Sequence, residues 1–420
     1  MALSNLFISL FALVGTPLFV IIAALALLNF YHGGIDLTVV FIEMYRIAET
    51  PTLSAIPLFA FTGFLLAESK AANRLVNLSQ VLMGWLPGGL AIMAIVICAV
   101  FTAFTGASGM TIVALGGLLY PALLKNRYPD NFSLGLLTTS GSLGLLFPPS
   151  IALIIYGIVA ETPIDQLFIA GIIPGLLLVG ALSLYSYFKG RAHTHLPARE
   201  VKLSTLLQAL RESSWELLLP LVVIAGIYTG TIAVSEAAAL SALYILIVEM
   251  AIHREIHWRQ LPGIIRETMV MVGGIIVVLA AALAYTNYLI DAQIPYQLLG
   301  FIERHIDSRL VFLILLNLFL LAVGCMIDMF SALLVVVPLI LPISQAYDIH
   351  PIHLGIIFLT NLEIGYSTPP VGLNLFIASM RFEKPVLKLY WASLPFLFIL
   401  LGVLLLITYV PELSLFLLPH

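Results

Sequence analysis

Charged residues are scarce in this sequence. Aspartate, glutamate, lysine and arginine make up 10% of the 420 residues, whereas hydrophobic residues make up 61%, and the mean hydropathy is +1.10. Soluble globular domains carry about 25% charged residues, so this composition excludes an ordinary soluble domain. Because a membrane-spanning helix needs about 20 apolar residues, the length leaves room for roughly ten to twelve spans and hairpins. We therefore expect an all-α polytopic membrane protein.

The sequence contains two cysteines. Cys98 and Cys325 both lie in apolar runs with no second cysteine or histidine at metal-binding spacing, which excludes a disulfide framework and a zinc site. No tract rich in lysine and arginine points to nucleic acid. The apolar run from Leu6 to Phe30 lacks the basic segment that precedes a cleaved signal, so we interpret it as a retained membrane segment.

The few basic residues predict the orientation in the membrane. They gather around Lys70, Lys125, residues 189–211, residues 254–266 and residues 381–388. By the positive-inside rule these places are cytoplasmic, and linkers without lysine or arginine face outward. The pattern predicts a multi-pass protein of the bacterial inner membrane but leaves the side of the N-terminus open. The amphipathic stretches 71–85 and 203–212 are expected to lie flat at the lipid headgroups, with a solvated linker helix as the alternative.

An internal repeat emerges from the prolines and glycines. Pro or Gly residues recur 221 positions apart in five pairs: Pro121 and Pro342, Gly144 and Gly365, Pro148 and Pro369, Pro149 and Pro370, Pro174 and Pro395. The predicted loops give the two copies opposite directions through the membrane. An inverted repeat with Gly/Pro-interrupted segments in matching positions indicates a secondary-transporter binding site.

The two diprolines predict broken helices. Proline lacks an N–H and its ring clashes with the carbonyl four residues earlier, so we expect unpaired carbonyls at Gly144 and Leu145, and at Gly365 and Tyr366. Phe147 is expected to leave helical geometry because it precedes a proline. An unpaired carbonyl in hydrocarbon persists only where protein, water or an ion supplies a partner, which favours a Na⁺ site. The alternative is a kink that only shapes packing.

Each break follows a segment that turns back on itself. Residues 91–125 begin and end near basic clusters and are interrupted at 106–109, and residues 311–343 are the corresponding segment, with an interruption at 324–328. We interpret both as re-entrant hairpins whose tips meet the broken helices. Each predicted cation site is then shared between one tip and one break.

Three strings carry a family resemblance: SGSLGLLFPPSIALIIYG, AGIIPGLLL and NLEIGYSTPPVGLNLFIAS. Together with Leu86-Pro-Gly-Gly-Leu90, they resemble the large membrane subunit of tripartite ATP-independent periplasmic (TRAP) transporters over nearly the whole chain. The resemblance implies a Na⁺-driven, elevator-type secondary transporter for a small organic anion. It also implies two partners on separate chains, a small four-helix membrane subunit and a periplasmic substrate-binding protein.

The resemblance also supplies a domain division and site residues. Residues 1–90 and 189–310 are expected to form a scaffold, and 91–188 and 311–410 the two transport repeats. The first cation site falls on Gly106, Ala107, Ser108, Ser140, Gly141 and Gly144, the second on Gly324, Asp328, Asn361, Gly365 and Thr368, and the substrate site on Ser142, Ser150 and Asn374. Ala107 and Gly109 depart from the serine and alanine that many members carry, which rules out a side-chain role at Ala107.

Three side chains near the second site have alternative roles. Asp328 is expected either to bind Na⁺ or to cap the returning helix of the hairpin. Glu363 is expected to pair with an arginine or to carry a coupling charge, since a charge inside a span is costly. Asn374 is expected to donate to a substrate carboxylate or to a carbonyl of the broken helix.

Two other classes of protein compete with a transporter. One is a channel, although paired breaks and hairpins suit alternating access better than a continuous pore. The other is a rhomboid-like serine protease, because Gly106-Ala-Ser-Gly109 matches its GxSG signature. That chemistry needs a histidine within reach of Ser108, and all nine histidines lie in or beside predicted loops or at the terminus. We therefore do not expect an enzyme.

Overall fold

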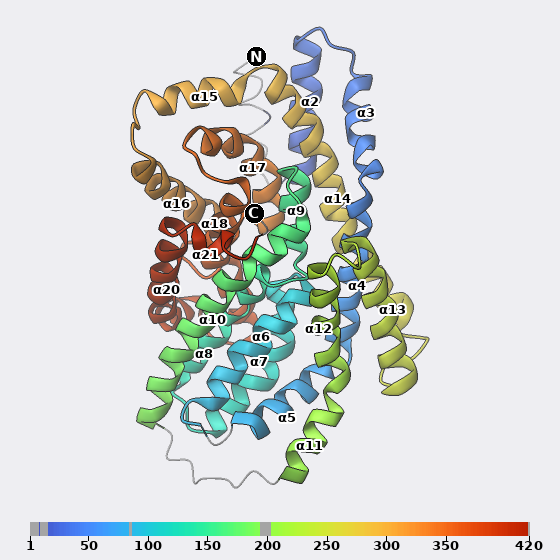
Figure 1. Ribbon diagram of the computed structural model, residues 1–420, viewed down its shortest axis with the longest axis vertical. Coiled ribbons are helices and arrows are strands. Elements are labelled where there is room, and N and C mark those ends of the chain that lie inside the picture. The colour runs from blue at the N-terminus through green and yellow to red at the C-terminus, as the bar shows by residue number, and fades with distance from the viewer. Residues whose placement is uncertain (1–7, 9–15, 84–85, 194–202, 419–420) are drawn as a thin grey trace.

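The computed structural model describes residue 8 and residues 16–83, 86–193 and 203–418, and every regular element in these ranges is a helix (Figure 1). The helices before the first repeat are α2 (Leu18–His32), α3 (Thr38–Arg46), η2 (Ile47–Glu49), η3 (Pro51–Ser54), α4 (Ala55–Glu68) and α5 (Ala71–Met83). Those between the repeats are α11 (Leu203–Glu212), α12 (Ser214–Tyr228), α13 (Val234–Ile247), the π-helix η5 (Val248–Ile252), α14 (Leu261–Asp291) and α15 (Ile294–Glu303).

The remaining helices form two series of the same order. The first series is α6 (Gly89–Thr105), α7 (Ser108–Lys125), α8 (Asp130–Ser140), η4 (Leu143–Leu146), α9 (Ile151–Val159) and α10 (Ile164–His193). The second is α16 (Arg309–Met326), α17 (Met329–Ala346), α18 (Pro351–Gly365), α19 (Leu373–Phe382) and α20 (Val386–Tyr409), followed by α21 (Glu412–Leu415). Helices α7 and α17 each contain 18 residues and begin 221 positions apart, at Ser108 and Met329. The repeat predicted from the prolines is therefore a repeat of helices.

The chain is a polytopic membrane protein. In the described ranges, eight helices are long and apolar enough to cross a membrane, and a ninth span results if the segments Asp130–Leu146 and Ile151–Val159, bent by 47°, count as one. The expected ten to twelve spans and hairpins include shorter segments as well, and five further apolar helices in these ranges have 10–17 residues. Of these, α6 belongs to the first hairpin, α18 and α19 flank the second break, and α2 precedes the first repeat.

The two hairpins lie at opposite ends of the molecule. In Figure 1 α6 and α7 occupy the lower half, whereas α16 and α17 occupy the upper half. The returning helix of each hairpin packs on the broken helix of the other repeat, α7 on α19 and α17 on α9. The two repeats therefore interlock.

One hydrogen bond marks the relation between the repeats. The Ser142 hydroxyl donates to the backbone carbonyl of Glu363 over 3.3 Å, and both residues are buried. These two positions are themselves 221 residues apart. In a two-fold arrangement, residues close to the axis contact their own counterparts. The pseudo-two-fold axis of the repeat therefore passes close to Ser142 and Glu363.

Helix α5 is fixed by the guanidinium of Arg74. This group binds the carboxylates of Glu216 at 2.7 Å, Glu249 at 2.8 Å and Glu255 at 2.6 Å. Burial raises the pKa of the Glu255 carboxyl, but the hydrogen bonds from Arg74 and from the Lys70 N–H outweigh it and leave the pKa lowered. Helices α5 and α11 confirm the two predicted amphipathic helices, and Trp85 lies outside the described residues. The ion pairs connect α5 to α12 and to the end of the α13–η5 span.

Candidate functional site

The first hairpin tip consists of two residues. Helix α6 ends at Thr105, Gly106 adopts a left-handed conformation with φ of 63°, Ala107 is extended, and α7 begins at Ser108. Glycine adopts positive φ without the clash that a side chain causes. The predicted tip of 106–109 was two residues too long, because Ser108 and Gly109 already belong to α7.

The second tip differs from the prediction. Gly324 and Cys325 lie within α16, Ile327 is extended, and Asp328 precedes α17. The Asp328 carboxylate accepts the Ser331 N–H over 3.0 Å, which is the geometry of an N-cap. The tip is therefore Ile327–Asp328 rather than 324–328, and Asp328 takes the capping role that was one of its two alternatives.

The first break has the predicted backbone. Phe147 is extended, with φ of −90° and ψ of 137°. The Ser150 hydroxyl caps α9 by accepting the Leu153 N–H at 3.4 Å. The peptide bonds Pro148–Pro149 and Pro369–Pro370 are both cis.

The prediction of unpaired carbonyls was wrong at three of four positions. The Gly144 carbonyl accepts the Phe147 N–H at 3.0 Å, and the Gly365 carbonyl accepts the Thr368 N–H at 2.9 Å. The Tyr366 carbonyl accepts the N–H of Asn374 across the break at 3.0 Å. Turns beside the diprolines supply these donors, which sequence reasoning did not consider. A carbonyl oxygen has a second lone pair, so an ion can still bind there.

Glycines bring each break against its hairpin. A Cβ atom on Gly144 would lie 2.2 Å from the Ala99 carbonyl oxygen and 2.5 Å from the Ala103 nitrogen. A Cβ atom on Gly365 would lie 2.7 Å from the backbone of Gly324, which is the counterpart of Ala103 in the repeat. The structure therefore unites Gly324 with Gly365 as predicted, and it repeats this contact in the first half.

At the first site, a hydrogen bond joins the two repeats. Ser108 at the first tip donates to the Asn374 side-chain oxygen over 2.7 Å, and both side chains are buried. The Asn374 Nδ2 group is buried without a hydrogen-bond partner among the described residues. A predicted cation-site residue and a predicted substrate residue thus meet, and the serine donates to an amide rather than to the histidine that a protease requires.

The other predicted substrate residues are already engaged. The Ser142 hydroxyl bonds to the Glu363 carbonyl, and the Ser150 hydroxyl caps α9. Thr102, which sequence reasoning missed, donates to the Gly141 carbonyl over 2.8 Å and lies 2.6 Å from the Thr111 hydroxyl. The sequence signal that could have identified Thr102 is a threonine inside an apolar run. Gly141 and Ser140 are both buried at the end of α8, next to this threonine pair.

At the second site, Asn361 is fully buried on α18. Its amide nitrogen donates to the Asn317 Oδ1 at 2.7 Å and to the Ile357 carbonyl at 2.8 Å. Its own Oδ1 has no hydrogen-bond partner among the described residues. The Thr368 hydroxyl donates to the Ile364 carbonyl at 2.8 Å. Asn317 was also missed, although an asparagine in an apolar run is a functional signal.

Apart from the Asp328 carboxylate, which caps α17, both candidate sites consist of neutral oxygen atoms. In the part of the chain that the structure describes, no group of three or more His, Cys, Asp or Glu side chains is placed to hold a metal ion. The available donors are backbone carbonyls, hydroxyls and the Asn361 amide oxygen. Hard cations prefer such oxygen ligands, so the donor set fits Na⁺ better than a transition metal.

Glu363 lies at the pseudo-two-fold axis without the expected ion pair. Its side chain is 1% exposed, and neither carboxylate oxygen has a hydrogen-bond partner among the described residues. The predicted pairing with an arginine was therefore wrong. The other alternative, a coupling charge at Glu363, stays a prediction.

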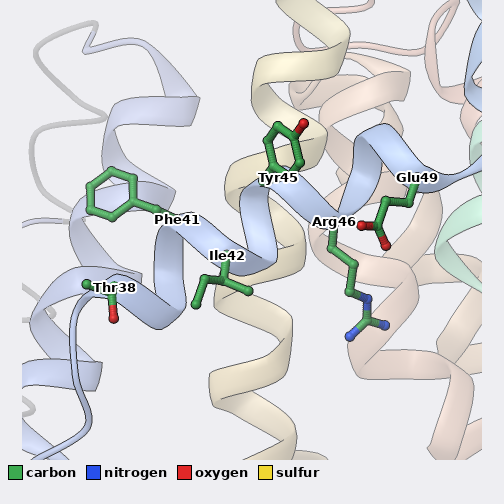
Figure 2. A pocket seen from close by; sticks show the side chains of 6 residues that line it. All are labelled: Thr38, Phe41, Ile42, Tyr45, Arg46 and Glu49. Atoms are coloured by element: carbon green, nitrogen blue, oxygen red, sulfur yellow. The ribbon is translucent and has the colours of Figure 1, made fainter.

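Two cavities lie at the outer helices. One, of about 720 Å³, lies between α3, α14, α17, the start of α13 and the turn that joins α9 to α10. Its charged or amide lining residues are Glu43, Arg46, Glu161, Asp165 and Asn287. The other, of about 520 Å³, follows one face of α3 and η2, where Figure 2 shows the side chains of Thr38, Phe41, Ile42, Tyr45, Arg46 and Glu49. Acidic groups outnumber the single arginine in the first cavity.

Paired hairpins, paired broken helices and their interlocked contacts define a membrane transporter, and comparison with known proteins supplies the family. The family model of the tripartite ATP-independent periplasmic transporter, DctM component, matches residues 6–413, and the chain belongs to this family. It is therefore a multi-pass protein of the bacterial inner membrane, and its family name denotes a three-component system.

Relatives within the family differ in their named substrates. The C4-dicarboxylate TRAP transporter large permease protein DctM of Pseudomonas aeruginosa is 36% identical over 375 residues, which are 89% of this chain and 88% of that protein. The ectoine/5-hydroxyectoine TRAP transporter large permease protein UehC of Ruegeria pomeroyi is 31% identical over 411 residues, 96% of this chain and 95% of that protein. Family membership therefore does not fix a substrate.

A solved structure shares the fold. The crystal structure of the Alcanivorax borkumensis YdaH transporter superposes with a TM-score of 0.60, covering 89% of this chain and 90% of that chain at 15% identity. At this identity the likeness extends to the arrangement of helices.

Proposed function

We propose that this chain is the large permease subunit of a Na⁺-driven transporter that takes up a small organic anion. The observation that supports Na⁺ coupling is the buried, unpaired Oδ1 of Asn361, one helical turn before the Gly324–Gly365 contact. A buried polar oxygen without a partner costs about 1–3 kcal/mol. A bound cation would remove this cost and would hold the break against the hairpin.

The anion would bind between the repeats. Asn374 offers a buried amide donor next to the first tip, and a carboxylate accepts such a donor. The cavity of about 720 Å³ is lined by three carboxylates and one guanidinium. Accompanying cations would therefore reduce the electrostatic repulsion of an anion that passes it. We further propose that residues 91–188 and 311–410 move as an elevator against a scaffold of 1–90 and 189–310.

Two partners complete the proposed transporter. The small four-helix membrane subunit would bind the scaffold, and the periplasmic substrate-binding protein would deliver the anion. The test is uptake into proteoliposomes that hold this chain and its small partner, with C4-dicarboxylates as the first substrates. We expect uptake that requires both the binding protein and an inward Na⁺ gradient.

An equal inward K⁺ gradient serves as the control for ionic strength. Uptake that continues without the Na⁺ gradient and without the binding protein would refute the proposal. Ion conduction without either component would instead indicate a channel.

A further inference from the structure

The orientation of the Asn361 amide is fixed by its neighbours. Both of its N–H groups are used, one by the Ile357 carbonyl and one by Asn317 Oδ1. Rotating the amide by 180° would place its oxygen against these two acceptors, which is unfavourable. The free oxygen therefore has one permitted direction.

Asn317 and Asn361 sit on facing sides of α16 and α18. Gly324 lies seven residues after Asn317, and Gly365 lies four residues after Asn361, so each pair shares a helix face. The glycine contact and the asparagine contact are therefore successive contacts of one helix interface. The Asn317 side chain sits two turns before Gly324 and about three turns before the hairpin tip at Ile327.

Asn317 is itself held by a third helix. Its Nδ2 donates to the Thr408 hydroxyl of α20 over 3.2 Å. The backbone carbonyl of Thr408 lies 3.3 Å from the His353 Nε2, and the other His353 ring nitrogen lies 3.2 Å from the Ser414 hydroxyl. The five residues that form this series of contacts are all buried: Asn361, Asn317, Thr408, His353 and Ser414. The Asn361 amide is thus the inner end of a network that extends to α21.

The first repeat has no such network. The counterparts of Asn317, Asn361 and Thr408, each 221 positions earlier, are Val96, Ser140 and Tyr187. Because the first repeat folds into the same helices without these amides, the fold itself does not require them. Buried polar groups in a membrane are costly and are usually functional.

We propose that Asn317, held by Thr408, is a positioning residue that directs Asn361 Oδ1 toward the cation of the second site. The inference rests on the proposed Na⁺ coupling. Without Asn317, the Asn361 amide loses one of its two acceptors and can turn its oxygen away. Na⁺ affinity then falls, whereas transport at saturating Na⁺ is retained.

The test measures the Na⁺ dependence of two quantities. These are the unfolding temperature of the purified full chain, at ionic strength kept constant with K⁺, and the rate of uptake by the assembled transporter. Asn317→Leu is expected to raise the Na⁺ concentration for half-maximal effect about tenfold, the equivalent of one hydrogen bond. Asn317→Asp keeps the acceptor and is expected to need no more Na⁺ than the wild type.

Two further variants complete the series. Thr408→Val removes the support of Asn317 and is expected to raise the Na⁺ requirement about threefold, a fraction of one hydrogen bond. Thr360→Val is the matched control, because Thr360 is buried beside Asn361 and its hydroxyl bonds only to the Ile356 carbonyl of its own helix at 2.7 Å. Its Na⁺ dependence is expected to equal that of the wild type.

The inference is overturned if Asn317→Leu has the wild-type Na⁺ requirement, or if Asn317→Asp is as weak as Asn317→Leu. A loss of stability with unchanged Na⁺ dependence would show that the two asparagines only join helices. Failure of the proposed function is distinguishable: the wild type itself would then respond equally to Na⁺ and K⁺. If the wild type responds to Na⁺ and Asn361→Ala does not change that response, the cation lies elsewhere and the inference falls.

Discussion

The two diproline breaks have the same backbone design but different surroundings. Every residue from 141 to 150 except Phe147 is buried, and Pro148 adjoins side chains of α10 and α12 such as Phe168 and Ile227. At the second break, Pro369, Pro370 and Val371 are exposed. The first break is thus enclosed by other helices, whereas the second can change its contacts without disturbing a core.

The hairpin tips show the same difference. Gly106 at the first tip is buried, whereas Met326 and Ile327 at the second are 68% and 45% exposed. An inverted repeat with one half closed and the other open is the asymmetry that alternating access requires.

The largest effect is expected from valine at the break glycines. Gly144→Val forces side-chain atoms into the Ala99 carbonyl inside an enclosed interface, which should cost more than about 3 kcal/mol and remove folded protein from the membrane. Gly365→Val meets Gly324 near an exposed tip that can shift, so it should insert normally but abolish Na⁺-driven uptake. Membrane abundance and uptake distinguish the two.

Gly402→Val is the control for this pair, since a Cβ atom there has no neighbour within 4 Å. We expect normal abundance and uptake from it. Equal loss of folded protein from Gly144→Val and Gly365→Val would show that both breaks are equally enclosed, contrary to the comparison.

The next effect concerns the contact between the repeats. Ser108→Ala leaves the buried Asn374 oxygen without its donor, which costs about 1–3 kcal/mol and should lower the rate of uptake about tenfold while leaving some activity. In the second half, the Met329 N–H at the corresponding position donates to the Tyr366 hydroxyl. Tyr366→Phe should have the smaller effect on uptake, because the bond that it removes lies within the second repeat and does not join the two repeats. The reverse order of the two uptake rates would contradict the comparison.

A moderate effect is expected from Thr102→Val, which is nearly isosteric. It removes the hydrogen bond to the Gly141 carbonyl and should lower the stability by about 1 kcal/mol, measured as a shift in unfolding temperature. The corresponding position in the second repeat already holds a valine, Val323, so the variant makes the first site resemble the second. An unchanged unfolding temperature would mean that this bond contributes nothing to the closed half.

Effects no larger than that of Thr102→Val are expected at the two helix caps. Asp328→Ala removes a capping hydrogen bond of 3.0 Å and should lower the free energy of unfolding by about 1 kcal/mol. Ser150→Ala removes one of 3.4 Å and should cost about half as much. Asp328→Asn retains a capping oxygen and should restore the stability if Asp328 is only a cap, whereas a persistent loss of the Na⁺ response in that variant would point to a ligand.

Much of the fold followed from prolines and glycines, because these residues act on the backbone directly. The 221-residue spacing located both hairpins, both breaks and the helices that contain Pro121, Pro174, Pro342 and Pro395. The second tip was misplaced because Gly324 served as the marker. A Cβ atom on Gly324 would crowd Gly365. The turn itself is formed by Ile327 and Asp328, and only the capping preference of Asp328 signalled it in the sequence.

The candidate site was predicted less completely, because its hydrogen bonds join residues that are far apart in the sequence. Ser108 and Asn374 were assigned to separate sites, and only the interlocked packing of α7 and α19 brings them together. The partners of the freed carbonyls depend on local turns that a pattern of apolar residues does not specify. Asn317 and Thr102 were visible as polar residues in apolar runs, but their partners are tertiary.

The packing of α7 on α19 has a consequence for how the chain is made. Ser108 and its partner Asn374 are 266 residues apart, so the first hairpin leaves the ribosome long before the helix that covers it exists. During synthesis the Ser108 hydroxyl must find another partner, from lipid headgroups, the insertion machinery or a chaperone. Nascent chains that stop before residue 373 would therefore expose this hairpin to the quality-control proteases of the membrane.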